Sequence, residues 1–126
     1  MKLDTYFETH QGIGVLSTAD AEGRVNAAIY GRPHVLDEQT VAFIAADRLT
    51  RANLQANPSA VYLFKEEGVY TGKRLYLTRT REEKDSPLID EIRRKKERAA
   101  GREGTGPRFL VYFRVDKVLP LTGGGE

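Results

Sequence analysis

Hydrophobic residues along the chain fall into short runs separated by turn-forming residues, a pattern typical of a β-rich protein. The runs 13–18 and 24–31 are separated by the turn-forming stretch 20–23 (DAEG), which predicts a hairpin. Run 40–46 (TVAFIAA) is β-branched and almost wholly apolar, which predicts a strand covered on both faces. The remaining strands are predicted at 60–65, 73–81 and 108–121, which makes six.

Three helical segments are predicted between these strands, at 3–10, 50–56 and 86–99. The middle segment is stopped by an Asn-Pro pair, because a residue before proline avoids the helical region. The last segment has Ser86 as its N-cap and Pro87 at its first helical position, with basic residues crowding its later turns.

Strands at close spacing, joined mostly by hairpins, indicate an antiparallel barrel or sandwich rather than a doubly wound parallel sheet. The stretch GIG at 12–14 lacks the third glycine of a dinucleotide-binding fingerprint and opens no helix. The length of 126 residues allows one hydrophobic core, so we expect residues 1–126 to form a single domain. The loop 101–107 is predicted to be flexible, and the tail 118–126 to be partly disordered.

Composition narrows the possible functions. Hydrophobic residues make up 40% and charged residues 30%, as in globular domains, and a net charge of +2 does not indicate nucleic acid. The absence of cysteine excludes disulfides, thiolate nucleophiles and sulfur-ligated zinc, and two histidines do not predict a metal centre. No apolar run approaches the length of a membrane span, and the start lacks the apolar region of a secretory signal, so we expect a cytoplasmic protein.

The start of the helix predicted at 50–56 is a candidate anion site. The first turn of a helix leaves backbone N–H groups unpaired, and the helix dipole adds partial positive charge there. Arg48 and Arg51 add forked cationic donors, and Thr50 adds a hydroxyl, which together suit a phosphate. The small residues Ala45 and Ala46 just before it leave room for a flat aromatic ligand.

The same residues also fit an ordinary helix start. Threonine and aspartate are common N-caps, and arginines are usually solvated. Asp47 opposes an anion unless it pairs with an arginine. Local sequence alone leaves both interpretations open.

The order of elements resembles that of the pyridoxamine 5′-phosphate oxidase-like family of FMN-binding split barrels. The similarity extends over residues 6–121, and its specific part is VNAAIYG (25–31) together with TVAFIAADRLTRANLQANPSAVYLF (40–64). The resemblance implies a mainly β fold, a six-stranded antiparallel split β-barrel with short helices. It also implies a homodimer with a flavin at each of two sites along the interface.

Site residues follow from the resemblance by position. It implies that the segment Arg48–Arg51 holds the FMN phosphate, and that two strands run beside the ribityl chain and the ring. The implied FMN-binding residues are Asn26, Ala27, Ala28, Ile29, Ile44, Ala45, Ala46, Arg48, Leu49, Thr50 and Arg51. Leu49 departs from the family pattern, where a lysine often occurs around this position, so Arg48 or Arg51 must supply the charge.

The resemblance predicts a flavin-dependent oxidoreductase that acts on an unidentified small molecule. True pyridoxamine phosphate oxidases carry an Arg-x-His element and a Trp-Gln-Gly segment, which this chain lacks, so that activity is not expected. A non-enzymatic electron carrier or flavin-holding protein is the alternative, and a deazaflavin or haem in place of FMN also stays open. The basic run 93–98 and the aromatic residues leave a nucleic-acid-binding barrel as a third hypothesis.

Two further sets of polar residues have plain interpretations. The carboxylates of Glu82, Glu83 and Asp85 are predicted to form a solvated turn before the last helix, without a metal partner. His34 follows a proline and serves either as a structural residue or as a proton donor to a flavin or substrate. No Ser-His-Asp or paired-acid arrangement is present that would predict a hydrolase.

Overall fold

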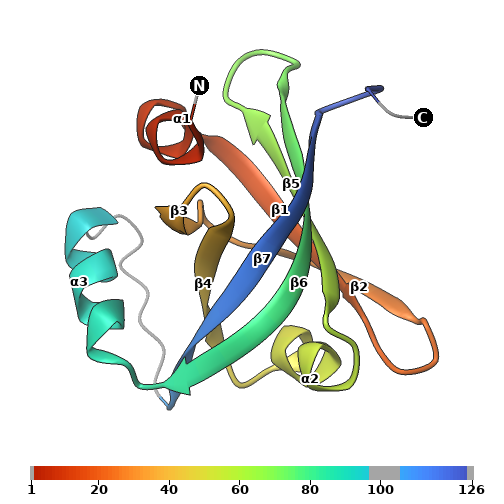
Figure 1. Ribbon diagram of the computed structural model, residues 1–126, viewed down its shortest axis with the longest axis vertical. Helices are drawn as coiled ribbons and strands as arrows, with labels where there is room; N and C mark the ends of the chain where they lie inside the picture. The colour runs from red at the N-terminus through yellow and green to blue at the C-terminus, as the bar shows by residue number, and fades with distance from the viewer. Residues whose placement is uncertain (1, 97–105, 125–126) are drawn as a thin grey trace.

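The structure is a computed structural model that describes residues 2–96 and 106–124 (Figure 1). It is mainly β, with three short helices packed around one antiparallel sheet. The strands are β1 (Gly12–Ala19), β2 (Val25–Ile29), β3 (His34–Asp37), β4 (Thr40–Ala46), β5 (Ser59–Glu66), β6 (Gly72–Lys84) and β7 (Arg108–Pro120). The helices are α1 (Leu3–Thr9), α2 (Leu49–Ala56) and α3 (Pro87–Lys96).

The sheet is curled but not closed. Its strand order is β2-β1-β5-β6-β7-β4-β3, and every adjacent pair is antiparallel. The predicted antiparallel β fold is therefore confirmed, but the count of six strands is wrong, because the described residues form seven. The missed strand is β3, which has only four residues, follows Pro33 and pairs with β4 through an irregular register. Four residues are too few for an alternation of apolar and polar positions to be recognised in the sequence.

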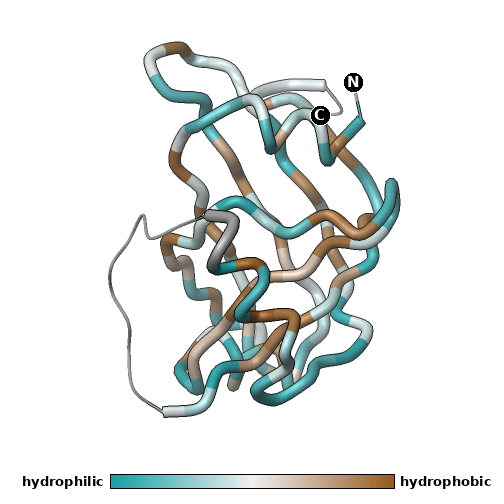
Figure 2. Tube along the Cα trace, turned by 90° about the vertical axis from the view of Figure 1, so that its left-hand side faces the viewer, coloured by the Kyte–Doolittle hydropathy of each residue, from teal (hydrophilic) through white to brown (hydrophobic). Residues whose placement is uncertain are grey.

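The core lies inside the curled sheet. Along β5, the side chains of Ala60, Tyr62 and Phe64 are buried, while those of Val61 and Leu63 are half-buried on the other face, as a period of two requires. Figure 2 shows the same alternation of hydrophobic and hydrophilic positions along the strands. The fully buried side chains that the other strands add to this core are Leu16, Val41, Leu75, Val111 and Phe113.

Helix α1 covers one end of this core. It contributes Leu3, Tyr6 and Phe7 to the core cluster. The Tyr6 hydroxyl donates a hydrogen bond of 2.6 Å to Glu66, at the end of β5. The Arg32 guanidinium donates to the carbonyl oxygen of Phe7, which ties the chain after β2 to the last turn of α1. Residues 3–10 were predicted to be helical, and α1 confirms this to within one residue.

Helix α3 covers the outer face of β4 and β7. Its Ile89 and Ile92 are buried against Ala42, Leu110 and Tyr112. The helix predicted at 86–99 is confirmed for 87–96. Residues 97–99 of that helix, 101–105 of the loop predicted to be flexible and 125–126 of the predicted tail lie outside the described residues. Residues 118–120 of the predicted tail are part of β7. No helix in the described part of the chain is long and apolar enough to span a membrane.

Tyr62 fixes the chain where β2 ends. Its hydroxyl donates hydrogen bonds to the carbonyl oxygens of Tyr30 (3.2 Å) and Gly31 (3.0 Å), and the side chain is fully buried. The hydroxyl passes directly over Gly14 on β1, where an added Cβ atom would lie 2.0 Å from the Tyr62 oxygen. Glycine is therefore required at position 14 for the Tyr62 side chain to reach β2.

We expect Gly14→Ala to destabilise the protein by about 1–3 kcal/mol, the usual cost of overpacking a core. The matched control is Gly31→Ala, because a Cβ atom at Gly31 meets nothing within 4 Å. That variant should stay within about 0.5 kcal/mol of the parent. Urea denaturation followed by circular dichroism measures both values. Equal stability of the two variants would show that the Tyr62 ring is free to move aside.

Candidate functional site

The sheet ends at β2 on one side and at β3 on the other, and we call the region between β2 and the part of β4 that β3 leaves uncovered, where α2 contacts both strands, the split. Strand β2 pairs with β1 alone, and β4 pairs with β7 along its whole length but with β3 only at residues 40–42. Both strands were predicted to line a ligand. The structure therefore places an unpaired edge of each predicted strand beside helix α2.

Main-chain groups of β2 point toward the opening. The Tyr30 N–H donates to the Gly14 carbonyl at 3.0 Å, which identifies this pair as hydrogen-bonded. Because hydrogen-bonded residues alternate along an antiparallel ladder, Asn26 and Ala28 also bond to β1. The N–H and C=O groups of Ala27 and Ile29 are therefore directed to the open edge.

Strand β4 presents its main chain in the same way. The Val115 N–H donates to the Gln39 carbonyl at 2.8 Å, so odd-numbered residues of β4 bond to β7. The even-numbered residues face β3, whose first residue, His34, lies opposite Ala42. The N–H and C=O groups of Ile44 thus point to the edge that β3 leaves uncovered.

Helix α2 closes one end of the opening and contacts β1, β2 and β4. Its position is set by Asn53, whose side-chain amide donates a 3.1 Å hydrogen bond to the Thr18 hydroxyl of β1. Both side chains are buried. The helix predicted at 50–56 is confirmed and begins one residue earlier, at Leu49. A buried polar pair therefore fixes the start of α2 beside the split.

Tyr30 joins the two sides of the split, and it was missed in the sequence. Its ring packs edge-on against the Phe43 ring of β4 at 6.0 Å, and its hydroxyl is close enough to the buried Thr50 side chain for the two to interact. Burial raises the pKa of the Tyr30 hydroxyl above its usual value, although the neighbouring Thr50 side chain and the charge of Arg48 oppose the shift. The available signal was its place in VNAAIYG, on the same side of β2 as Asn26 and Ala28.

The two arginines at the start of α2 have different surroundings. Arg48 is exposed and makes no ion pair with the other described residues. Arg51 is held by Glu82 and Asp47, and its guanidinium lies 3.7 Å from the centre of the Phe109 ring. Hydrogen bonding to Glu82 raises the pKa of the Arg51 guanidinium above its usual value. Within the described structure, Arg48 is therefore the more available cation.

The other predicted site residues lie around the split with different exposures. Asn26 and Ala28 are half-buried, whereas Leu49 is 56% exposed at the first position of α2. Ala45 is part of the core cluster, and the Ile44 side chain packs against the cluster under α3. A contact from Ile44 to a ligand must therefore come from its main chain, whereas the main-chain groups of Ala45 are already paired with β7.

The interpretation of Glu82 as part of a solvated turn is wrong. Strand β6 continues through Lys84, and the Glu82 side chain is only 14% exposed. A register shift between Arg79 and Arg81 turns it toward α2. A bulge cannot be recognised in a run of charged residues, because no alternation of apolar and polar positions is present there for it to interrupt.

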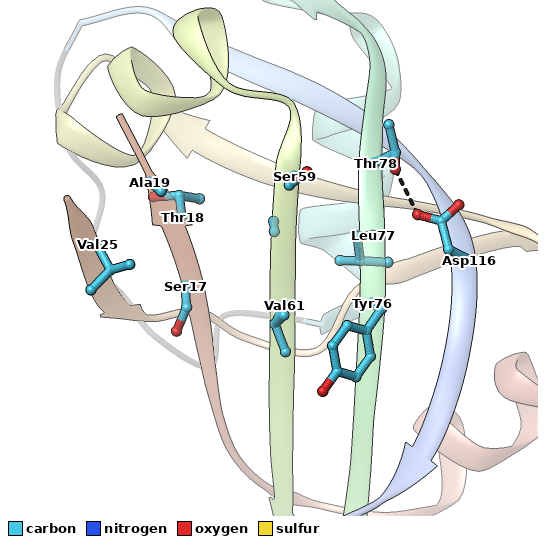
Figure 3. A pocket seen from close by; sticks show the side chains of 11 residues that line it. Ser17, Thr18, Ala19, Val25, Ser59, Val61, Tyr76, Leu77, Thr78 and Asp116 are labelled. Atoms are coloured by element: carbon cyan, nitrogen blue, oxygen red, sulfur yellow. Dashed lines mark hydrogen bonds between the residues drawn. The ribbon is translucent and has the colours of Figure 1, made fainter. Parts of the chain in front are cut away.

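A groove of about 310 Å³ lies away from the split, on the outer face of β1, β5 and β6 (Figure 3). Small side chains form much of its floor, and the Thr78 hydroxyl donates a 2.6 Å hydrogen bond to Asp116 at one side. The lining residues are Ser17, Thr18, Ala19, Val25, Ser59, Ala60, Val61, Tyr76, Leu77, Thr78 and Asp116. None of them is a predicted site residue, so the groove is a separate feature.

Metal ligands do not cluster in the part of the chain that the structure describes, where no three histidine or acidic side chains come together. His34 lies half-buried in β3, where it has interaction partners. His10 stacks on the Tyr6 ring at 4.4 Å. The two histidines thus belong to separate parts of the fold.

No protein-family model and no curated protein matches the sequence. Solved structures do match. An FMN-binding protein from Syntrophomonas wolfei has a TM-score of 0.78 and 20% identity over 97% of this chain and 85% of that chain. A Listeria innocua protein described as a candidate pyridoxamine 5′-phosphate oxidase has a TM-score of 0.65 and 16% identity over 96% and 98%. HutZ, the heme storage protein of Vibrio cholerae, has the same TM-score and identity over 94% of each chain.

These similarities establish the fold. The chain shares the split-barrel architecture of these structures along nearly its whole length, which confirms the fold that the sequence resemblance predicted. The structure corrects that prediction in its strand count and in the open sheet.

We expect Thr18→Val to destabilise the protein by about 1–3 kcal/mol, because it leaves the buried Asn53 amide without its acceptor. Thr40→Val is the matched control, since the half-buried Thr40 hydroxyl has no hydrogen-bond partner among the described residues. The control should change stability by less than about 0.5 kcal/mol. Thermal unfolding of both variants checks the difference, and a Thr18 variant as stable as the control would contradict the role of this bond.

Proposed function

We propose that the protein is a cytoplasmic FMN-binding flavoprotein that holds the flavin at the split between β2 and β4. The observation that carries the proposal is the convergence of the three predicted segments, two open strand edges and the start of α2, at one opening. The similarity of the fold to an FMN-binding protein supports FMN as the ligand. The flavin would supply hydride or electron transfer, and the protein its binding and orientation.

The phosphate is proposed to bind at the first turn of α2. Backbone N–H groups at this turn are not used by the helix itself, and the helix dipole favours an anion there. The Arg48 side chain is exposed beside this turn, and the Thr50 hydroxyl lies within it. Arg51 belongs to the same turn, but its guanidinium is shared with Glu82 and Asp47.

The ring is proposed to lie along the open strand edges. Ala27, Ile29 and Ile44 direct main-chain donors and acceptors to these edges. A flavin ring carries donors and acceptors along one side, which suits recognition by main-chain groups. The small side chains of Ala27 and Ala28 leave space for a flat ligand against β2.

Two roles of the bound flavin are proposed. A flavin-dependent oxidoreductase acting on a small molecule is our first choice, and a non-enzymatic electron carrier or flavin-holding protein is the alternative. The Tyr30 ring packs against Phe43 of β4, and its hydroxyl lies near the buried Thr50 side chain. This arrangement suits a role of Tyr30 in binding, so the redox chemistry would be that of the flavin.

A homodimer is proposed to form through the outer face of β1, β2 and β5. Ile13, Val25 and Ile29 are exposed by 52%, 80% and 66% on this face. Across the ladders, Val15 lies opposite both Ile29 and Leu63, so the apolar surface is continuous. A self-complementary face of this kind suits a two-fold contact between copies of the chain.

The purified protein should bind FMN and then show a flavin absorption spectrum. Arg48→Ala should weaken FMN binding by about 1.5–3 kcal/mol, the range for hydrogen bonds to charged groups, or about tenfold to over a hundredfold. Riboflavin, which lacks the phosphate, should bind the variant and the parent equally. Titration of flavin fluorescence measures all four affinities.

Arg24→Ala is the matched control for Arg48→Ala, because Arg24 is an exposed arginine in the β1–β2 turn. It should leave FMN binding unchanged. A parent protein that binds no flavin would refute the proposal. An absorption spectrum typical of haem or of a deazaflavin would show that this ligand, and not FMN, occupies the site. Strongly salt-dependent oligonucleotide binding would favour the nucleic-acid hypothesis instead.

Val25→Glu should dissociate the proposed dimer, because the two-fold brings like charges into an apolar contact. Its dimer dissociation constant should rise by about tenfold or more. Leu36→Glu is the control, since Leu36 is 42% exposed on β3, away from this face. Sedimentation of both variants over a range of concentrations gives the result. A monomeric parent, or a Val25→Glu variant that remains dimeric, would rule out this interface.

A further inference from the structure

Two charged side chains of β6, one on each side of its bulge, lie on the inner side of the sheet. Arg79 lies opposite Phe113, and after the register shift Glu82 lies opposite Val111. Phe113 and Val111 are fully buried core residues, so Arg79 and Glu82 face the interior. In a regular strand, residues three apart would face opposite sides. The extra residue of the bulge is thus what turns Glu82 toward α2.

The Glu82 carboxylate gathers donors from several side chains. One oxygen accepts hydrogen bonds from the Arg51 Nε atom at 3.2 Å and from a terminal nitrogen of the same guanidinium. The other accepts a 3.2 Å hydrogen bond from the Gln55 amide, and Arg79 approaches it to 3.9 Å. Two guanidiniums therefore share one partly buried carboxylate.

Arg51 is drawn away from the start of α2 by this carboxylate. It is the third residue of the helix, so its backbone lies in the first turn. Its guanidinium instead rests over the Phe109 ring of β7. Asp47 also holds it at 3.1 Å, but the Asp47 side chain is 60% exposed and is a weaker partner. A phosphate at the helix start and the Glu82 carboxylate would compete for one guanidinium.

We propose that Glu82 is a specificity-determining residue, which limits how much of the Arg51 charge reaches a ligand phosphate at the start of α2. The inference rests on the proposed FMN function. It makes Arg48 the principal cation for the phosphate. It also makes the preference for FMN over riboflavin smaller than two free arginines would give.

The test is the ratio of riboflavin to FMN dissociation constants. Both ligands carry the same ring, so general damage to the site weakens them together and leaves the ratio unchanged. Glu82→Gln keeps the size of the side chain and removes its charge, which frees Arg51. We expect the ratio to rise by about two- to fivefold, the factor that corresponds to one competing ion pair.

The same substitution made in an Arg51→Ala protein shows whether the rise in the ratio requires the Arg51 side chain. In an Arg51→Ala protein, Glu82→Gln should leave the ratio unchanged, because the remaining partner of Glu82, Arg79, belongs to β6 and not to the first turn of α2. Glu83→Gln is the matched control, since Glu83 lies next to Glu82 in sequence and pairs with Arg81 instead. It should also leave the ratio unchanged. Glu82→Asp, which keeps the charge but shortens the reach to Arg51, should give a smaller rise and serves if the glutamine variant does not fold.

The outcomes separate this inference from the proposed function. A parent protein that binds neither flavin overturns the proposed function and this inference with it. A parent that prefers FMN, with a ratio that Glu82→Gln leaves unchanged or lowers, overturns this inference alone. An equal rise in the Arg51→Ala background also overturns it, because the effect would then be general electrostatics.

Discussion

The hydrogen bonds from the Tyr62 hydroxyl to the end of β2 are the contacts on which the site most depends. The side chain starts in the middle of β5, crosses the core over Gly14 and reaches the carbonyl oxygens of Tyr30 and Gly31. It thereby fixes the edge strand of an open sheet, which has neighbours on one side only. Because Tyr30 follows directly, the same contact sets the ring that meets Phe43 and Thr50.

The open sheet leaves main-chain groups unpaired at its edges, and these groups are available to a ligand. A closed barrel would pair every main-chain group, whereas here β2 and part of β4 keep an unpaired edge. Those edges supply donors and acceptors without adding polar side chains to the interior. Helix α2 fills one end of the opening and is held by the buried Asn53–Thr18 pair. The opening is thus a defined part of the fold.

Electrostatics at the site depends on which arginine is free. Both arginines lie within one helical turn, but Arg51 is committed to Glu82, Asp47 and the Phe109 ring, whereas Arg48 faces solvent. The difference arises in β6, where one extra residue brings Glu82 to the inner side of the sheet. One extra residue in β6 thereby determines which arginine is available at the start of α2, although β6 and α2 are far apart in the sequence.

The sequence by itself determined the antiparallel β fold, the helices and six of the seven strands, because periodicity and turn chemistry are local properties. The strands β4 and β5 could be predicted from their long apolar runs for this reason. Strand β3 could not be predicted, because four residues beside a proline are too few to show a periodic pattern. The sequence also pointed to the start of α2. Only the tertiary structure decided which groups meet there: Tyr30 with Thr50, and Glu82 with Arg51. Those contacts join residues 20 and 31 positions apart, and they depend on strand register and on a bulge, which local sequence does not encode.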